Sequence, residues 1–91
     1  MENKRIKAIL EKIGLSGLEA ECYLTLLKRS PQRASELAKK FSMPKATVLL
    51  ALNHLVDEFG IVKRSRQKNT FLFLVEDVKE LLAFLEREES K

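Results

Sequence analysis

The side chains of this chain best suited to bind a ligand are cations, and they are concentrated in one segment. Residues 33–68 contain eight basic and three acidic residues, a local excess of five, whereas the net charge of the whole chain is +4. The basic residues are Arg33, Lys39, Lys40, Lys45, Lys63, Arg64, Arg66 and Lys68. Lysine and arginine neutralise phosphates, so this segment is typical of proteins that bind nucleic acid.

The same segment has a characteristic order of expected elements. The pattern predicts a helix over 33–40, a tight break at 41–43 and a second helix that Pro44 opens and Gly60 ends. Two short strands, 61–64 and 70–74, then flank a polar tip at 65–69. This order predicts a helix-turn-helix at 33–59 and a β-hairpin wing at 61–74, and the second helix of such a unit enters a DNA major groove.

Further helices are expected on both sides of this unit. Apolar residues recur at helical spacing over 2–13 and again over 76–89. Between them, Ser16 and Glu19 form the pattern of a capping box at the start of another helix. The sequence thus predicts a mainly α-helical fold with a small β-hairpin wing: one winged helix-turn-helix domain over 1–91, with extra N- and C-terminal helices.

Several residues of the second helix have side chains that can bind DNA. Lys45 can reach phosphate or guanine, Thr47 can reach phosphate or a thymine methyl, and Asn53 can bond adenine through both amide atoms. His54 could contact phosphate when protonated. The alternative is that these are merely solvated polar residues. The full set of candidate DNA-binding residues is Arg33, Ser35, Lys45, Ala46, Thr47, Leu49, Leu50, Asn53, His54, Lys63, Arg64, Arg66 and Lys68.

The wing and a leucine pair each allow two interpretations. Arg64, Arg66 and Lys68 are expected at the wing tip, where they would follow the DNA backbone or enter a minor groove; alternatively, they only protect an edge strand. Leu49 and Leu50 cannot form hydrogen bonds, and only one of them can reach the edge of the core. Such a pair is more typical of a protein contact patch. The alternative function is therefore a winged-helix module that uses this face to hold another protein or a second copy.

Residues 13–27, IGLSGLEAECYLTLL, resemble the "LGLT-x-x-EA-x-x-YL-x-LL" opening of the TrmB-like winged-helix transcriptional regulators. The resemblance continues through ASELA at 34–38, MPKATV at 43–48, ALNHL at 51–55 and GIV at 60–62, and reaches about Leu74. It implies a winged-helix fold, binding of double-stranded DNA and a homodimer. The chain differs from the family in its leucine pair and in a helix end that is one residue longer before Gly60. It also lacks a large sugar-binding region, so a stand-alone DNA-binding domain without a small-molecule effector is expected.

Composition argues against several other classes of protein. One histidine and one cysteine favour neither a metal cluster nor a Cys/His catalytic pair, and no glycine-rich phosphate loop occurs. Cys22 has apolar neighbours and is expected to be buried. No apolar run approaches the roughly 18 residues of a membrane span, and no signal peptide is expected. We therefore expect a non-enzymatic, cytoplasmic, nucleoid-associated protein without cofactor, metal or membrane partner. The apolar stripes of its two terminal helices predict a homodimer, because so small a core cannot cover both.

Overall fold

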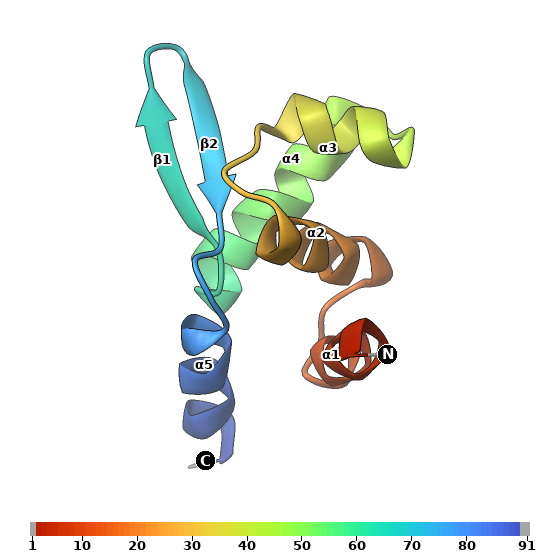
Figure 1. Cartoon of the computed structure of the whole chain (residues 1–91), viewed down its shortest axis with the longest axis vertical. Coiled ribbons are helices and arrows are strands. Elements are labelled where there is room, and N and C mark those ends of the chain that lie inside the picture. Colours follow the sequence, from red (N-terminus) through yellow and green to blue (C-terminus); the bar gives the residue numbers. More distant parts are fainter. Residues whose placement is uncertain (1, 90–91) are drawn as a thin grey trace.

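The computed structural model describes residues 2–89 and has the winged helix-turn-helix arrangement that the sequence predicts (Figure 1). Its elements follow in the order α1 (Glu2–Lys12), α2 (Gly17–Lys28), α3 (Ala34–Phe41), α4 (Lys45–His54), the π-helical turn η1 (Leu55–Phe59), β1 (Lys63–Gln67), β2 (Thr70–Leu74) and α5 (Lys79–Glu89). The hairpin rises beside α3 and α4, and both terminal helices lie at the end of the molecule opposite the hairpin turn (Figure 1). The expected fold class is confirmed.

Helix α2 begins at the predicted capping box and supplies much of the core. The Glu19 N–H donates to Ser16 Oγ (3.1 Å), and the Ser16 N–H donates to Glu19 Oε1 (2.8 Å). Tyr23, Cys22 and Leu26 are fully buried. Burial raises the pKa of the Cys22 thiol to about 12. Two donors at the start of the helix are thus paired. The expectation that Cys22 is buried is confirmed.

The helix-turn-helix has a tight turn between its two helices and a widened turn at its end. Ser42 adopts a left-handed conformation (φ 53°) between α3 and α4, and Pro44 directly precedes α4 in an extended conformation. Residues 55–59 then form a π-helical turn, which ends at Gly60 (φ 66°) with the Ile61 N–H donating to Leu55 O (3.2 Å). A π turn holds one residue more than an α turn. Such a turn is what the longer helix end before Gly60, expected from the family resemblance, would require.

The first wing strand differs from its prediction. It spans 63–67 instead of 61–64, because Ile61 and Val62 are almost fully buried and belong to the core rather than to the hairpin. The pairing runs from Lys63 opposite Leu74 to Gln67 opposite Thr70, which leaves only 68–69 as the turn. The predicted tip of 65–69 was therefore wrong by three residues, and Arg64 lies in the strand, away from the turn.

The other edge of β2 joins the hairpin to the helices. Phe73, the one residue of β2 that is fully buried, exchanges two backbone hydrogen bonds with Gln32, 2.9 and 2.8 Å long. Gln32 directly precedes the helix-turn-helix in the chain. This bridge sets the position of the wing relative to α3.

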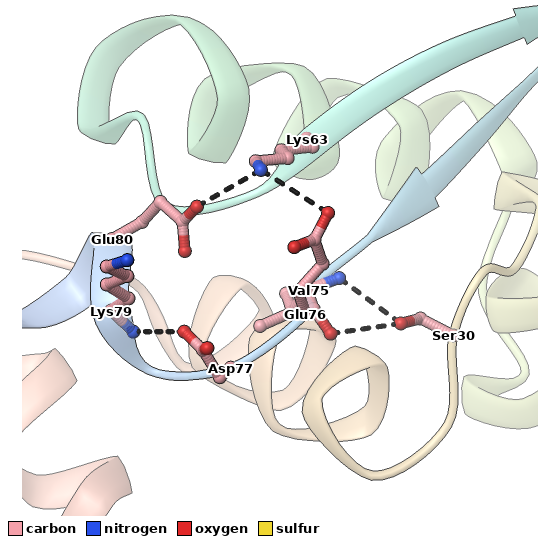
Figure 2. A network of polar contacts seen from close by, with 7 residues as sticks. All are labelled: Ser30, Lys63, Val75, Glu76, Asp77, Lys79 and Glu80. Atoms are coloured by element: carbon pink, nitrogen blue, oxygen red, sulfur yellow. Dashed lines mark hydrogen bonds and ion pairs between the residues drawn. The ribbon is translucent and has the colours of Figure 1, made fainter.

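Helix α5 begins at Lys79, three residues later than expected. Ser30 Oγ contacts the carbonyl oxygen and the N–H of Val75 at 3.1 and 3.2 Å and keeps this segment out of the helix, whereas Asp77 Oδ1 accepts from the Lys79 N–H at 2.7 Å. Figure 2 shows Lys63 between Glu76 (3.4 Å) and Glu80 (3.3 Å), which raise its pKa. These contacts join α5 to Lys63, the first residue of β1, at the base of the wing.

Glu19 also connects α2 to the end of α4. While its Oε1 holds the capping box, its Oε2 contacts His54 Nδ1. Burial alone would raise the pKa of Glu19, but the backbone N–H of Ser16 and the contact with His54 outweigh burial and lower that pKa below its ordinary value of 4.5. One carboxylate thus stabilises a helix start and a helix–helix contact.

Replacing Glu19 with Gln should weaken the fold at neutral pH by about 1 kcal/mol, since a charge-assisted cap becomes a neutral one. Because the pKa of Glu19 is lowered in the folded protein, its contribution to the free energy of unfolding is complete above pH 4.5 and is lost as the pH falls through the lowered pKa. In urea unfolding at several acidic pH values, the free energy of unfolding should fall more steeply with decreasing pH for the parent than for Glu19→Gln. Glu36→Gln is the matched control, because Glu36 Oε1 accepts from the Arg33 N–H at the start of α3 but is exposed. Equal slopes for parent and Glu19→Gln would contradict this assignment.

Candidate nucleic-acid interface

The exposed residues of α4 border two different hollows, one on each side of the helix. Lys45 and Leu49 line a hollow toward the wing, whereas Thr47, Leu50 and His54 line a groove toward the first turn of α2. Val48, Leu52 and the following Leu55 are fully buried. The helix therefore packs through one side and presents two chemically distinct edges.

The wing-side hollow brings together residues from three parts of the chain. Arg33 and Ser35 come from the start of α3, Lys45 from the first residue of α4, and Asn69 and Thr70 from the hairpin. A neighbouring hollow shares Arg33 and Thr70 and adds Gln67 and Lys68. No acidic residue lines either hollow. Three predicted cations, Arg33, Lys45 and Lys68, thus border two neighbouring hollows whose lining contains no carboxylate. Ala46 lies beside them, exposed in the first turn of α4.

Apart from Lys68, the hairpin residues bordering these hollows were not among the predicted site residues. Charge was the signal used for the wing, and Gln67, Asn69, Thr70 and Phe71 carry none. A two-residue turn with Lys68 at φ 54° brings Asn69 and Thr70 to face α3. Identifying them from the sequence would require the strand register, which the sequence pattern placed incorrectly.

The three remaining predicted cations lie along β1. Arg66 is exposed, with its guanidinium 5.9 Å from the centre of the Phe71 ring. Arg64 lies farther from the turn and reaches Asn53, and Lys63 is held by the two glutamates beside α5. Of the trio expected at the wing tip, only Lys68 lies in the turn, because β1 extends three residues beyond its predicted end.

The groove on the α2 side has a different character. It has a volume of about 540 Å³ and contains the apolar side chains of Leu18, Leu50 and Ala51, with Glu19, Asp57 and Glu58 also among its lining residues. Leu50 is 74% exposed, whereas Leu49 is half-buried and packs against the core. The expectation that only one of the two leucines reaches the core is confirmed.

His54 and Asn53 already have protein partners in this structure. His54 Nδ1 contacts the Glu19 carboxylate, and its ring meets Phe59 edge-on with centroids 5.2 Å apart. Asn53 Oδ1 accepts a hydrogen bond from Arg64 Nη1 at 2.7 Å. No sequence signal joined His54 to Glu19 or Asn53 to Arg64, since the members of each pair are distant in the chain and lie on different elements.

Within residues 2–89, no group of three His, Cys, Asp or Glu side chains is placed to hold a metal ion. Across the same described residues, none of the helices has the length and apolar character needed to cross a bilayer.

The arrangement of elements agrees with the comparison with known families. The family model of the sugar-specific transcriptional regulator TrmB matches residues 10–90, which is most of the chain. No curated protein and no solved structure matches the chain. The matched region contains α2, the helix-turn-helix, the wing and all of α5. The chain therefore belongs to the TrmB family of winged-helix transcriptional regulators.

Proposed function

We propose that this protein regulates transcription by placing the N-terminal turn of α4 in a DNA major groove while the wing contacts the adjacent backbone or minor groove. The observation that carries the proposal is the pair of neighbouring hollows that α3, α4 and the hairpin build with Arg33, Lys45 and Lys68 and without a carboxylate in their lining. Cations brought together from separate elements in this way suit a row of phosphates. The family supports a non-enzymatic DNA-binding role in the compartment that holds the chromosome.

The helix starts on this face also suit an anionic partner. The first turns of α3 and α4 both lie here, through Ser35 and Lys45. Helix N-termini carry partial positive charge and unpaired N–H groups that bind phosphate oxygens. In the first two turns of α4, Ala46, Thr47 and Leu49 can contact base edges through methyl groups and one hydroxyl.

We also propose that the protein acts as a homodimer through its terminal helices. Leu10 and Leu81 are buried, but Ile9 is 42% and Leu82 53% exposed. These helices lie at the end of the molecule away from the hairpin turn (Figure 1), so pairing there leaves the basic face free. Two-fold pairing presents two recognition helices to a palindromic site.

A second function is favoured by the exposed Leu50 and its groove. Three of the residues that line this groove are acidic, so DNA is a poor occupant and a positively charged amphipathic segment of another protein is a good one. Burying Leu50 would stabilise such a complex by about 2 kcal/mol. In this alternative, α4 contacts a protein instead of DNA.

Replacing Arg66 and Lys68 together with alanine should weaken binding to all duplexes by a similar factor, because these residues neutralise phosphates and read no base. The slope of log affinity against log salt should fall by about two. Fluorescence anisotropy over a salt series measures both quantities. Lys39→Ala with Lys40→Ala is the matched control, since it removes equal charge from the exposed last turn of α3, outside both hollows. A control variant as weak as the wing variant would contradict a role for this face.

Replacing Leu50 with Arg separates the two functions. If α4 reads DNA, the exposed position accepts arginine without loss of folding, and non-specific DNA affinity rises. If the groove holds a protein, an unpaired charge enters an apolar contact, and the complex or the dimer dissociates at a cost of several kcal/mol. DNA affinity and oligomer mass should be measured on the same sample. Loss of the dimer without a gain in DNA affinity would contradict the primary proposal.

Light scattering at micromolar concentration should give about twice the chain mass of 10.5 kDa. Replacing Leu82 with Glu should reduce the mass to one chain, because it places a charge in the proposed contact. Far-UV circular dichroism should be unchanged, since Leu82 is already half-exposed. A parent protein that is monomeric at this concentration would refute the dimer.

A further inference from the structure

Arg64 connects the wing to the recognition helix. Its Nη1 donates to Asn53 Oδ1 at 2.7 Å, and its Nη2 lies 3.7 Å from Asp57 Oδ1. Its guanidinium carbon lies 5.6 Å from the centre of the Phe71 ring, and one third of the side chain is exposed. The group therefore contacts β2, the end of α4 and the π turn together, and all three contacts suit its positive charge.

Arg66 shows that strand position alone does not produce this arrangement. It lies on the same side of β1, opposite Phe71, and contacts the same ring at 5.9 Å. No hydrogen bond or ion pair joins it to α4 within the described residues. Arg66 is thus free to meet a phosphate, whereas a move of Arg64 to DNA would break its contacts with Asn53 and Asp57.

The contact with Arg64 fixes the orientation of the Asn53 amide. A guanidinium only donates hydrogen bonds, so the amide atom that faces it must be the oxygen. The Nδ2 group is left with two donors that have no partner among the described residues. Binding adenine through both amide atoms requires Oδ1 to accept from N6 while Nδ2 donates to N7. In this structure one lone pair of Oδ1 already accepts from the Arg64 guanidinium, and the adjacent positive charge makes the oxygen a weaker acceptor for a second donor.

We propose that Arg64 is a positioning residue that sets the base preference of Asn53, and that Asn53 reads guanine through its free Nδ2 donors. Guanine offers two neighbouring acceptors, N7 and O6, in the major groove, whereas adenine offers one acceptor and one donor. The inference rests on the proposed entry of α4 into DNA. It replaces the adenine contact that the sequence alone suggests for Asn53.

The first test uses binding-site selection from random duplexes, followed by affinities for selected duplexes in which single guanines are changed to adenine. The parent should prefer guanine at one position by about tenfold, the usual range for one specific base contact. Arg64→Met keeps the unbranched stem of the side chain but removes the guanidinium and releases Oδ1, so the preference at that position should fall to near unity or shift to adenine. Arg66→Met is the matched control. It should weaken binding to all duplexes by the same factor and keep the preference for guanine.

Asn53→Ala makes the assignment specific to this pair. It should remove the guanine preference, and adding Arg64→Met to it should change the preference no further. If Arg64→Met instead weakens all duplexes equally and flattens the salt dependence, Arg64 is a phosphate contact and the inference is overturned.

A second readout does not depend on DNA. The side-chain amide signals of Asn53 in a ¹H–¹⁵N spectrum should shift in Arg64→Met and stay unchanged in Arg66→Met. Arg64→Lys, which keeps the charge but not the forked geometry, serves if Arg64→Met folds poorly. Unchanged Asn53 signals in the Arg64 variants would overturn the inference. Shifted signals in a protein that binds no duplex would refute the proposed DNA-binding function and the base reading, but would retain Arg64 as a link between wing and helix.

Discussion

The burial of Phe73 is the constraint on which the rest of the structure depends. Its side chain is fully buried, and its backbone forms both bonds of the bridge to Gln32. Strand β1, with the sequence KRSRQ, is exposed throughout and has no apolar residue to hold it in place. It exists as a strand because β2 is anchored through Phe73 and offers it a paired edge. The direction of the wing, and hence the position of its cations, follows from one aromatic ring.

Helix α4 separates two surfaces of opposite character. The side that faces the wing is bordered by Arg33, Lys45 and Lys68, whereas the side that faces α2 is bordered by Glu19, Asp57 and Glu58. A duplex approaching the first side meets attraction, and one that rotates toward the second meets repulsion. Such a charge division restricts the orientations in which a helix can lie on DNA. In the DNA complex proposed above, the acidic side would therefore favour one docking direction even without touching the duplex.

Features that depend on neighbours in the chain were predictable, and features that depend on tertiary packing were not. The capping box of Ser16 and Glu19 joins residues three apart, so the pattern alone predicts it. The first wing strand was misplaced because Ile61 and Val62 look like strand residues, and only the packed core shows that they are needed elsewhere. The contact of Arg64 with Asn53 joins residues eleven apart on different elements, and no periodicity encodes it. The binding of DNA by the candidate residues stays a prediction.

The π turn at 55–59 has a consequence for how this fold tolerates changes in length. One additional residue in an α-helix would rotate everything after it by about 100°, because an α turn holds 3.6 residues. Here the surplus is contained within a single widened turn, and Ile61 beyond it is still buried in the core. Removing one residue from this turn would convert it to an α turn and leave the hairpin in place. The junction between helix and wing is therefore a point at which chains of this architecture can gain or lose a residue without altering the surface they present.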